Sequence, residues 1–245
     1  MVYDERFRTV YSSDPASAPG RMEAIVKELG GFEFVKPEPA SEEEILLVHS
    51  PSHLERVKAL PSVYPLALLA AGGAIKASEL AVRGEPSFAL IRPPGHHAGP
   101  SSCWGFCYFN NLAISLRRLL RLGRIRKGAV VDFDLHYGDG TASIFSGSRE
   151  VSYHHAEGTR EEILEGIASF LEKGDYEVIA VSAGFDNHLE DWGGTLSTDD
   201  YRKIGETVKE WSLRKCGGRR YGVLEGGYNL SVLGRNVRAF LEGFG

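Results

Sequence analysis

A regular alternation of short apolar runs with longer amphipathic segments extends along the 245 residues and governs the architecture. Runs of four or five apolar, β-branched residues predict buried strands, and apolar residues at helical spacing predict helices between them. Strands that alternate with helices form a parallel sheet covered on both faces. We therefore expect one α/β domain over residues 1–245, with a central, mostly parallel β-sheet and helices on both faces. The expected strands are Phe32–Val35, Ser87–Ile91, Ala129–Phe133, Val151–His154, Val178–Ser182 and Tyr221–Leu224.

The segments between these runs carry helix signals. Ser197 and the polar residues after it can cap the N-terminus of a helix, because short polar side chains accept its free backbone N–H groups. The acidic run 42–44 predicts a solvated first helical turn. The expected helices are Arg21–Leu29, Ser52–Leu60, Leu66–Val82, Asn111–Leu122, Glu161–Glu172, Asp199–Arg214 and Val232–Glu242.

Composition argues against several classes of protein. The chain has 28 Lys+Arg against 33 Asp+Glu, a net charge of −5 that predicts no basic face and no direct nucleic-acid binding. The longest apolar stretch, Val63–Ile75, is too short to span a membrane and contains Pro65. Asp4 and Glu5 stand where a signal peptide needs apolar residues, so a cytoplasmic protein is expected. The chain has only three cysteines, an odd number that is consistent with free thiols in a reducing cytosol. They are Cys103, Cys107 and Cys216.

Ionisable residues gather directly after four of the expected strands. Glycine accounts for 29 of 245 residues, and its excess collects in the same turns. Ligands bind outside the carboxyl ends of the strands in such sheets, so this edge is the expected site. The turns are Arg92–Pro100, Asp134–Thr141, Ala183–His188 and Glu225–Tyr228.

One of these turns carries a pattern suited to a metal. Asp134 and His136 are two positions apart, so in extended chain both side chains point the same way and can ligate one ion. Asp186, after a neighbouring strand, would be a third ligand. Two carboxylates and one imidazole leave a coordination position open, as catalytic metal sites require. Aspartate is also common in turns, and Asp134 and His136 alone are equally well explained as strand-end caps.

The adjacent His96 and His97 follow the earlier strand in an irregular Pro-Gly turn, from which both rings can reach one cavity. Imidazole titrates near neutral pH, so such a pair beside a metal is suited to moving protons. Each ring would need an orienting carboxylate, and Asp132 and Asp139 are available on the metal-bearing segment. In isolation, two satisfied turn histidines would be the simpler interpretation.

Five motifs, read together, resemble the histone deacetylase and acetylpolyamine amidohydrolase family, which shares an arginase-like α/β fold. The resemblance covers essentially the whole chain. The motifs are RPPGHHA at 92–98, GFCYFNN at 105–111, DFDLHYGDGT at 132–141, VSAGFDNH at 181–188 and VLEGGYN at 223–229.

The resemblance implies a role for each matching residue. Asp134, His136 and Asp186 correspond to the zinc ligands, and Tyr228 to the tyrosine that polarises the substrate carbonyl. His96 and His97 correspond to the active-site histidines, with Asp132 and Asp139 as their respective partners. Arg21 is similar to an arginine that lines the family's inner acetate-release cavity. The residues expected to contact substrate are Gly95, Phe106, Gly226 and Gly227.

The family also has monovalent-cation sites, and Phe145, Val151 and Ser152 stand where they could help to bind a structural K⁺. The sequence departs from the family at its rim. Tyr137 replaces a third histidine, and the stretch between Leu60 and Leu66 is too short for the loop that carries a substrate-gripping aspartate. The chain between 154 and 178 lacks the element that forms one wall of the substrate channel. A homo-oligomer could rebuild that wall.

The expected activity is zinc-dependent hydrolysis of an acetyl-amine amide, in an N-acetyl-lysine peptide or an acetylated polyamine, with Fe²⁺ or Co²⁺ as alternative metals. Metal-activated water would be the nucleophile, His97 the base and Tyr228 the oxyanion donor. A two-manganese ureohydrolase is a competing interpretation, although it would need a further acidic ligand. A binding protein that senses acylated ligands is another. His49 and His53 have helical i,i+4 spacing and could bind a metal, but Pro51 starts a helix between them, so a surface or capping role is expected instead.

Overall fold

The computed structural model describes all 245 residues and has a five-stranded sheet at its centre. Every neighbouring pair of strands is parallel, and the strand order is β1-β5-β4-β2-β3. The expected strand before each of the four turns named above is present, so the predicted parallel α/β sheet is confirmed. The strands are β1 (Ser87–Ala89), β2 (Gly128–Asp132), β3 (Val151–His155), β4 (Ile179–Ala183) and β5 (Arg220–Leu224).

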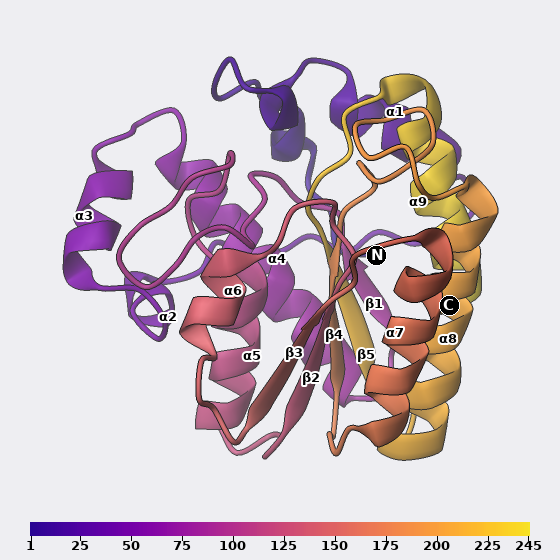
Figure 1. The fold of residues 1–245 in the computed structure, drawn as a ribbon. Helices are drawn as coiled ribbons and strands as arrows, with labels where there is room; N and C mark the ends of the chain where they lie inside the picture. The colour runs from indigo at the N-terminus through magenta and orange to yellow at the C-terminus, as the bar shows by residue number, and fades with distance from the viewer.

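Helices cover both faces of the sheet, as the alternation predicts. Helices α4 and α5 pack together on one side, and α7, α8 and α9 with α1 lie on the other (Figure 1). Seven of them match the expected ranges to within a few residues, whereas the short α6 was not expected. The helices are α1 (Arg21–Glu28), α2 (Glu42–Ile45), α3 (Pro51–Lys58), α4 (Tyr64–Val82), α5 (Asn111–Arg121), α6 (Asp139–Ile144), α7 (Arg160–Lys173), α8 (Thr198–Cys216) and α9 (Leu230–Phe244), after 3-10 turns at Glu5–Arg8 and Pro15–Ser17.

Local signals account for where α8 begins. Ser197 accepts from the backbone N–H of Asp200, and the Asp200 carboxylate accepts from the Ser197 N–H in return. This reciprocal capping box satisfies two backbone donors that a helix start otherwise leaves free. Arg160, at the start of α7, donates to the same buried carboxylate at 2.9 Å through Nε. Two neighbouring helices are thus joined at one aspartate.

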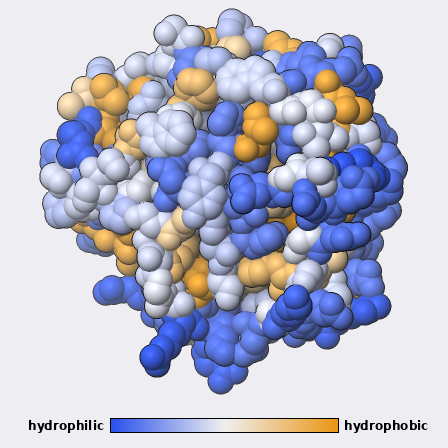
Figure 2. Space-filling model, in the orientation of Figure 1, coloured by the Kyte–Doolittle hydropathy of each residue, from blue (hydrophilic) through white to orange (hydrophobic).

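Helix α4 is longer than the apolar stretch Val63–Ile75 from which a membrane span was excluded. It has 19 residues with a mean hydropathy of 1.3, so by length and composition it could cross a membrane. In the fold, 67% of its most apolar window is buried, with Ala70, Ala74 and Ala77 against the core. It is therefore the core helix of this domain. The surface in Figure 2 is largely hydrophilic, with scattered apolar residues.

The expected strand at Phe32–Val35 is wrong. Only Val35 pairs, in isolated bridges that link Val2 to Val35 and to Ala89. Phe34 and Val35 are 41% and 39% exposed, so this apolar run lies along the surface instead of inside the sheet. Apolar composition alone does not distinguish a buried strand from an extended segment on the surface.

The register of the sheet brings the functional turns together. Asp132 is paired with Ser182, and Ser182 in turn with Val223, so β2, β4 and β5 end at the same level. The segments that follow them leave the sheet side by side at its carboxyl edge, above the strands in Figure 1. Gly226 and Asp134, 92 positions apart in sequence, are therefore within hydrogen-bond distance there.

Candidate active site

Three residues at this edge form a group that can hold a metal ion. Asp134 and His136 follow β2, and Asp186 follows β4. One ligand atom from each lies within 4.8 Å of the others. His136 Nδ1 is 3.3 Å from Asp134 Oδ1 and 3.1 Å from Asp186 Oδ2. The two carboxylates are buried and His136 is partly exposed, so the group opens toward solvent on one side.

Backbone groups fix these carboxylates. Gly226 N–H donates to Asp134 Oδ2 at 2.8 Å, and Leu135 N–H donates to Asp186 Oδ1 at 3.1 Å. A Cβ on Gly226 would come within 2.6 Å of Asp134 Oδ2 and 2.7 Å of Asp186 Oδ2. Only glycine therefore leaves room for this approach.

The electrostatics of the group suit a cation. Asp134 and Asp186 raise the pKa of His136 to about 10, and burial together with Asp134 raises the pKa of Asp186 to about 6. Asp186 Oδ2 is buried and makes no hydrogen bond. An orphaned carboxylate oxygen facing a second carboxylate and an imidazole is the donor set that a divalent metal satisfies.

Two histidine–aspartate pairs stand beside this group, as the sequence predicts. His97 Nδ1 is 2.7 Å from Asp139 Oδ1, and His96 Nδ1 is 3.2 Å from Asp132 Oδ2. The imidazole centroids of His96 and His97 are 4.1 Å apart, and both rings are buried. The irregular turn at 92–100 therefore lets both imidazole rings face the same cavity.

The two pairs differ in charge. Burial acts to lower the pKa of His96, but the carboxylates of Asp134 and Asp132 outweigh it and hold this pKa well above its usual range. Burial and the neighbouring His96 hold the pKa of His97 below its usual range, although Asp139 acts against them. His97 is thus the ring that is neutral near pH 7, and His96 the one that carries charge.

Tyr228 and Arg21 complete the floor of the site. The Arg21 guanidinium carbon lies 5.7 Å from the centre of the Tyr228 ring. Arg21 is fully buried and donates to the carbonyls of Gly227 and Glu225 at 2.8 and 2.6 Å. Burial raises the pKa of the Tyr228 phenol, so it remains a hydrogen-bond donor at neutral pH.

Comparisons with known proteins agree with this geometry. Residues 15–162 and 156–244 match the histone deacetylase domain. The chain belongs to the histone deacetylase family. A probable deacetylase of Methanothermobacter thermautotrophicus is 32% identical over 282 residues, which cover 91% of this chain and 84% of that protein. The polyamine deacetylase HDAC10 of Danio rerio is 29% identical over 313 residues, covering 97% of this chain and 46% of that protein.

The fold comparison agrees as well. The crystal structure of the HDA15 HD domain superposes with a TM-score of 0.85 and 23% identity, over 99% of this chain and 90% of that one. The arrangement of strands and helices is therefore that of a histone deacetylase domain, and the chain is a member of a hydrolase family.

In this histone deacetylase family member, one supporting residue was missed by the sequence analysis. Glu225 is buried, and its Oε2 accepts from the backbone N–H of Gly95 at 2.7 Å and of His96 at 3.2 Å. Its Oε1 accepts from Ser182 Oγ at 3.3 Å. Burial raises the pKa of Glu225 to about 7. Glu225 ties the histidine turn to β5, and its place directly after a strand, in the turn 225–228, was the available signal.

Aromatic residues form the mouth. A cavity of about 100 Å³ is lined by Phe106 and Tyr228 together with two indoles, Trp104 and Trp192. Trp104 donates to Asp139 Oδ2 at 2.9 Å and packs on His97, with ring centroids 3.9 Å apart. Trp104 and Trp192 are 55% and 53% exposed. The sequence predicted a missing wall, but Trp192, from the segment after β4, lines the cavity.

The expected surface role of His49 and His53 is wrong. Both are buried; His49 Nε2 accepts from the Asn110 N–H at 2.9 Å and His53 Nε2 lies 2.8 Å from the Tyr108 carbonyl. Burial lowers the pKa of His49 to about 3, so it is neutral. These rings support the loop that carries Phe106.

Proposed function

We propose that the protein is a zinc-dependent deacetylase that hydrolyses the amide of an acetylated amine. The observation that carries this proposal is the convergence of a metal-ligand group, two histidine–aspartate pairs and a tyrosine on one small cavity. Its volume of about 100 Å³ suits an acetyl group and the first carbons of a slender chain.

The proposed ligands are Asp134, His136 and Asp186. Zinc accepts one nitrogen and two carboxylate oxygens and keeps a position open, which Fe²⁺ or Co²⁺ could also do. When bound, zinc supplies a Lewis acid that polarises the acetyl carbonyl and lowers the pKa of a water molecule.

In the proposed mechanism His97 moves the protons. Its neutral ring can accept a proton from the attacking water, because its pKa is held below the usual range. Asp139 then stabilises the imidazolium that forms, through the 2.7 Å contact with Nδ1. The same imidazolium returns the proton to the leaving amine.

His96 and Tyr228 stabilise charge. The His96 ring, held charged by Asp132 and Asp134, offsets the negative charge of the tetrahedral intermediate. The Tyr228 hydroxyl donates a hydrogen bond to the developing oxyanion. Of the three glycines expected to contact substrate, Gly226 lines the cavity, whereas a Cβ on Gly95 would meet Phe109 and one on Gly227 would meet Leu233. The Phe106 ring, 6.0 Å from that of Tyr228, would contact the chain beyond the acetyl group.

The proposed substrates are N-acetyl-lysine peptides and acetylated polyamines; a relative is named a polyamine deacetylase. The structural K⁺ near Phe145, Val151 and Ser152 stays a prediction, as does a cytoplasmic location. The three cysteines are free, which suits a reducing compartment.

The experiment is an assay of zinc-loaded protein, with a chelated sample and His97→Ala as controls. Acetate release from an acetyl-lysine peptide or N-acetylputrescine that depends on zinc and on His97 is the expected result. Activity equal in all three samples would reject the proposal. Two metal ions per chain, with urea released from a guanidino substrate, would support the ureohydrolase alternative.

A further inference from the structure

A depression lined by arginines lies at the end of the sheet opposite the candidate active site. Its volume is about 400 Å³, and three separate segments contribute to it. Arg83 follows α4, Arg118 and Arg124 lie in and just after α5, and Arg219 precedes β5. The catalytic residues follow strand ends, whereas Arg124 and Arg219 precede strand beginnings. Strands of five residues separate the two sites by about 16 Å.

Most of this positive charge has no partner within the protein. Arg118 is 2.7 Å from a carboxylate oxygen of Glu44 and 2.7 Å from one of Glu79. Arg83, Arg124 and Arg219 have no carboxylate within 4.0 Å. The lining therefore holds three guanidiniums without an ion pair, beside an Arg118 that is paired with Glu44 and Glu79, on a chain whose net charge is −5.

The unpaired charge is concentrated at the depression, although Arg121 beside it also has no ion pair. Residues 117–127 include six Lys or Arg and no acid, but those that lie outside the depression are largely paired. Arg117 contacts Glu150 at 3.1 Å and Arg126 contacts Glu177 at 2.7 Å. A nucleic acid needs a continuous basic stripe, which these pairs interrupt. The overall composition predicts no basic face, and only the fold reveals this local one.

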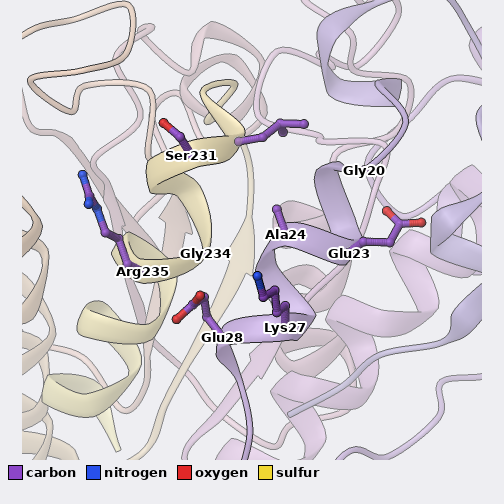
Figure 3. Close-up of a pocket in the computed structure, with 9 residues that line it drawn as sticks. Gly20, Glu23, Ala24, Lys27, Glu28, Ser231, Gly234 and Arg235 are labelled. Atoms are coloured by element: carbon purple, nitrogen blue, oxygen red, sulfur yellow. The ribbon is translucent and has the colours of Figure 1, made fainter.

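A second depression shows that size alone does not make such a site. The groove between α1 and α9 has a volume of about 560 Å³, and Figure 3 shows the side chains that line it. Glu23 and Glu28 balance Lys27 and Arg235 there, and Arg235 also pairs with Glu190 at 2.7 Å. That groove has no net charge to attract an ion.

Helix ends account for Arg83 and for Arg118, which lies in the last turn of α5, but not for the other two arginines. A cation near the last turn of a helix offsets the helix dipole, and Arg83 adjoins the end of α4 in this way. Arg124 and Arg219 lie outside helices, in the turns before β2 and β5. Their charge remains available to a ligand.

We propose that this depression binds an organic phosphate of about nucleotide size. Guanidinium groups bind phosphate oxygens in a bidentate manner, and the three arginines without a carboxylate partner can contact one or two phosphate groups. Leu119 and Leu122 line the same depression, and Leu122 is 55% exposed, so an apolar or aromatic body has a surface to contact. A cavity of about 400 Å³ falls within the range of small-molecule sites.

The test is calorimetric titration of the zinc-loaded protein with ADP, with pyrophosphate and adenosine as separate probes. ADP is expected to bind, pyrophosphate to bind more weakly, and adenosine not to bind. The double variant Arg124→Gln/Arg219→Gln should weaken ADP binding at least tenfold, about 1.4 kcal/mol. Arg149→Gln is the matched control, because Arg149 is exposed, outside the depression and without a carboxylate within 4.0 Å. Its affinity should equal that of the wild type.

Several results would overturn the proposal. Absence of ADP binding, or equal affinity in the double variant whose thermal unfolding is unchanged, would reject it. Loss of ADP binding in Asp186→Ala would show that ADP binds at the candidate metal group. Binding of a 20-nucleotide strand but not of ADP would indicate a nucleic-acid surface. Deacetylase activity should be the same in the double variant as in the wild type, so this proposal and the proposed function can fail separately.

Discussion

The indole of Trp192 stacks on the phenol ring of Tyr228, with ring centroids 4.1 Å apart and planes inclined by 28°. Asp191 holds the two segments together, because its Oδ2 accepts from the backbone N–H groups of Tyr228 and Asn229 at 2.8 Å each. The segment after β4 therefore positions the proposed oxyanion donor and also lines the mouth. The sequence suggested that the catalytic residues and the rim of the cavity were separate, but both depend on this one segment.

Removal of the Tyr228 hydroxyl tests its proposed role. Tyr228→Phe keeps the ring and its stacking on Trp192 but deletes the donor. We expect kcat to fall on the order of 10²–10³-fold, as for loss of one oxyanion donor, with metal content unchanged. Steady-state kinetics and metal analysis check this. Wild-type kcat would show that the hydroxyl does not reach the oxyanion.

Asp186→Ala tests the metal group. It removes a buried carboxylate that has one oxygen without a hydrogen bond. We expect loss of bound zinc and of activity, with the circular dichroism spectrum of a folded α/β protein retained. Asp191→Ala is the comparison within the same segment, because Asp191 lies outside the ligand group and should leave zinc bound. Full zinc content in Asp186→Ala would remove Asp186 from the ligands.

The lowered pKa of His97 predicts the pH profile. A general base acts when neutral, that is, above its pKa, and burial with the charged His96 holds this pKa below the usual 6.5. The acidic limb of kcat/KM should therefore have its midpoint below pH 6.5. Asp139→Asn removes a carboxylate that raises the His97 pKa, so the limb should move further to acid while kcat falls about 10²-fold or more. A limb that moves to higher pH in Asp139→Asn would contradict this assignment.

The grouping of the candidate metal ligands could be predicted from the sequence, whereas the residues packed around them could not. Asp134, His136 and Asp186 could be brought together in advance, because parallel strands place their carboxyl ends at one edge of the sheet. Trp192 could not be found in this way, since a single tryptophan in a loop has no period and no motif. The burial of His49 depends on how a distant loop packs over it, which no local pattern records. The arginine depression likewise depends on three segments that meet only in the fold.

Asp200 gives a stability prediction that is independent of the metal. Burial acts to raise its pKa, but hydrogen bonds from Arg160 and Ser197 outweigh this and hold it below the usual range. A carboxyl with a depressed pKa contributes stability above its unfolded pKa of about 3.9, and this contribution is lost as pH falls toward the folded value. Asp200→Asn should lower the free energy of unfolding by about 1–3 kcal/mol at pH 7.

Urea unfolding at pH 7 and pH 3 measures this difference, which should shrink at the lower pH. Asp199→Asn is the matched control on the same helix, because Asp199 is 62% exposed and pairs only with surface cations. Exposed pairs of this kind contribute less than about 1 kcal/mol. An equal effect of the two substitutions, or no dependence on pH for Asp200→Asn, would contradict the role assigned to the buried carboxylate.

Trp192 should determine how tightly the chain of the substrate is held. It lines the cavity beside Tyr228, and about half of the side chain is available to a ligand, since it is 53% exposed. Half of the 1.5–3 kcal/mol expected for burying a large apolar side chain is about 1 kcal/mol or slightly more. Trp192→Ala should therefore lower kcat/KM about fivefold to tenfold, mainly through KM, with zinc content unchanged.

The choice of substrate shows which part of the ligand Trp192 contacts. A contact with the alkyl chain is common to an acetyl-lysine peptide and N-acetylputrescine, so kcat/KM should fall equally for both, and their wild-type values should lie within about tenfold. Leu189→Ala is the control, because Leu189 is 59% exposed in the same segment but does not line the cavity. It should change neither value. A fall for the peptide alone would show that Trp192 contacts the peptide backbone, and that the mouth of this site selects peptides after all.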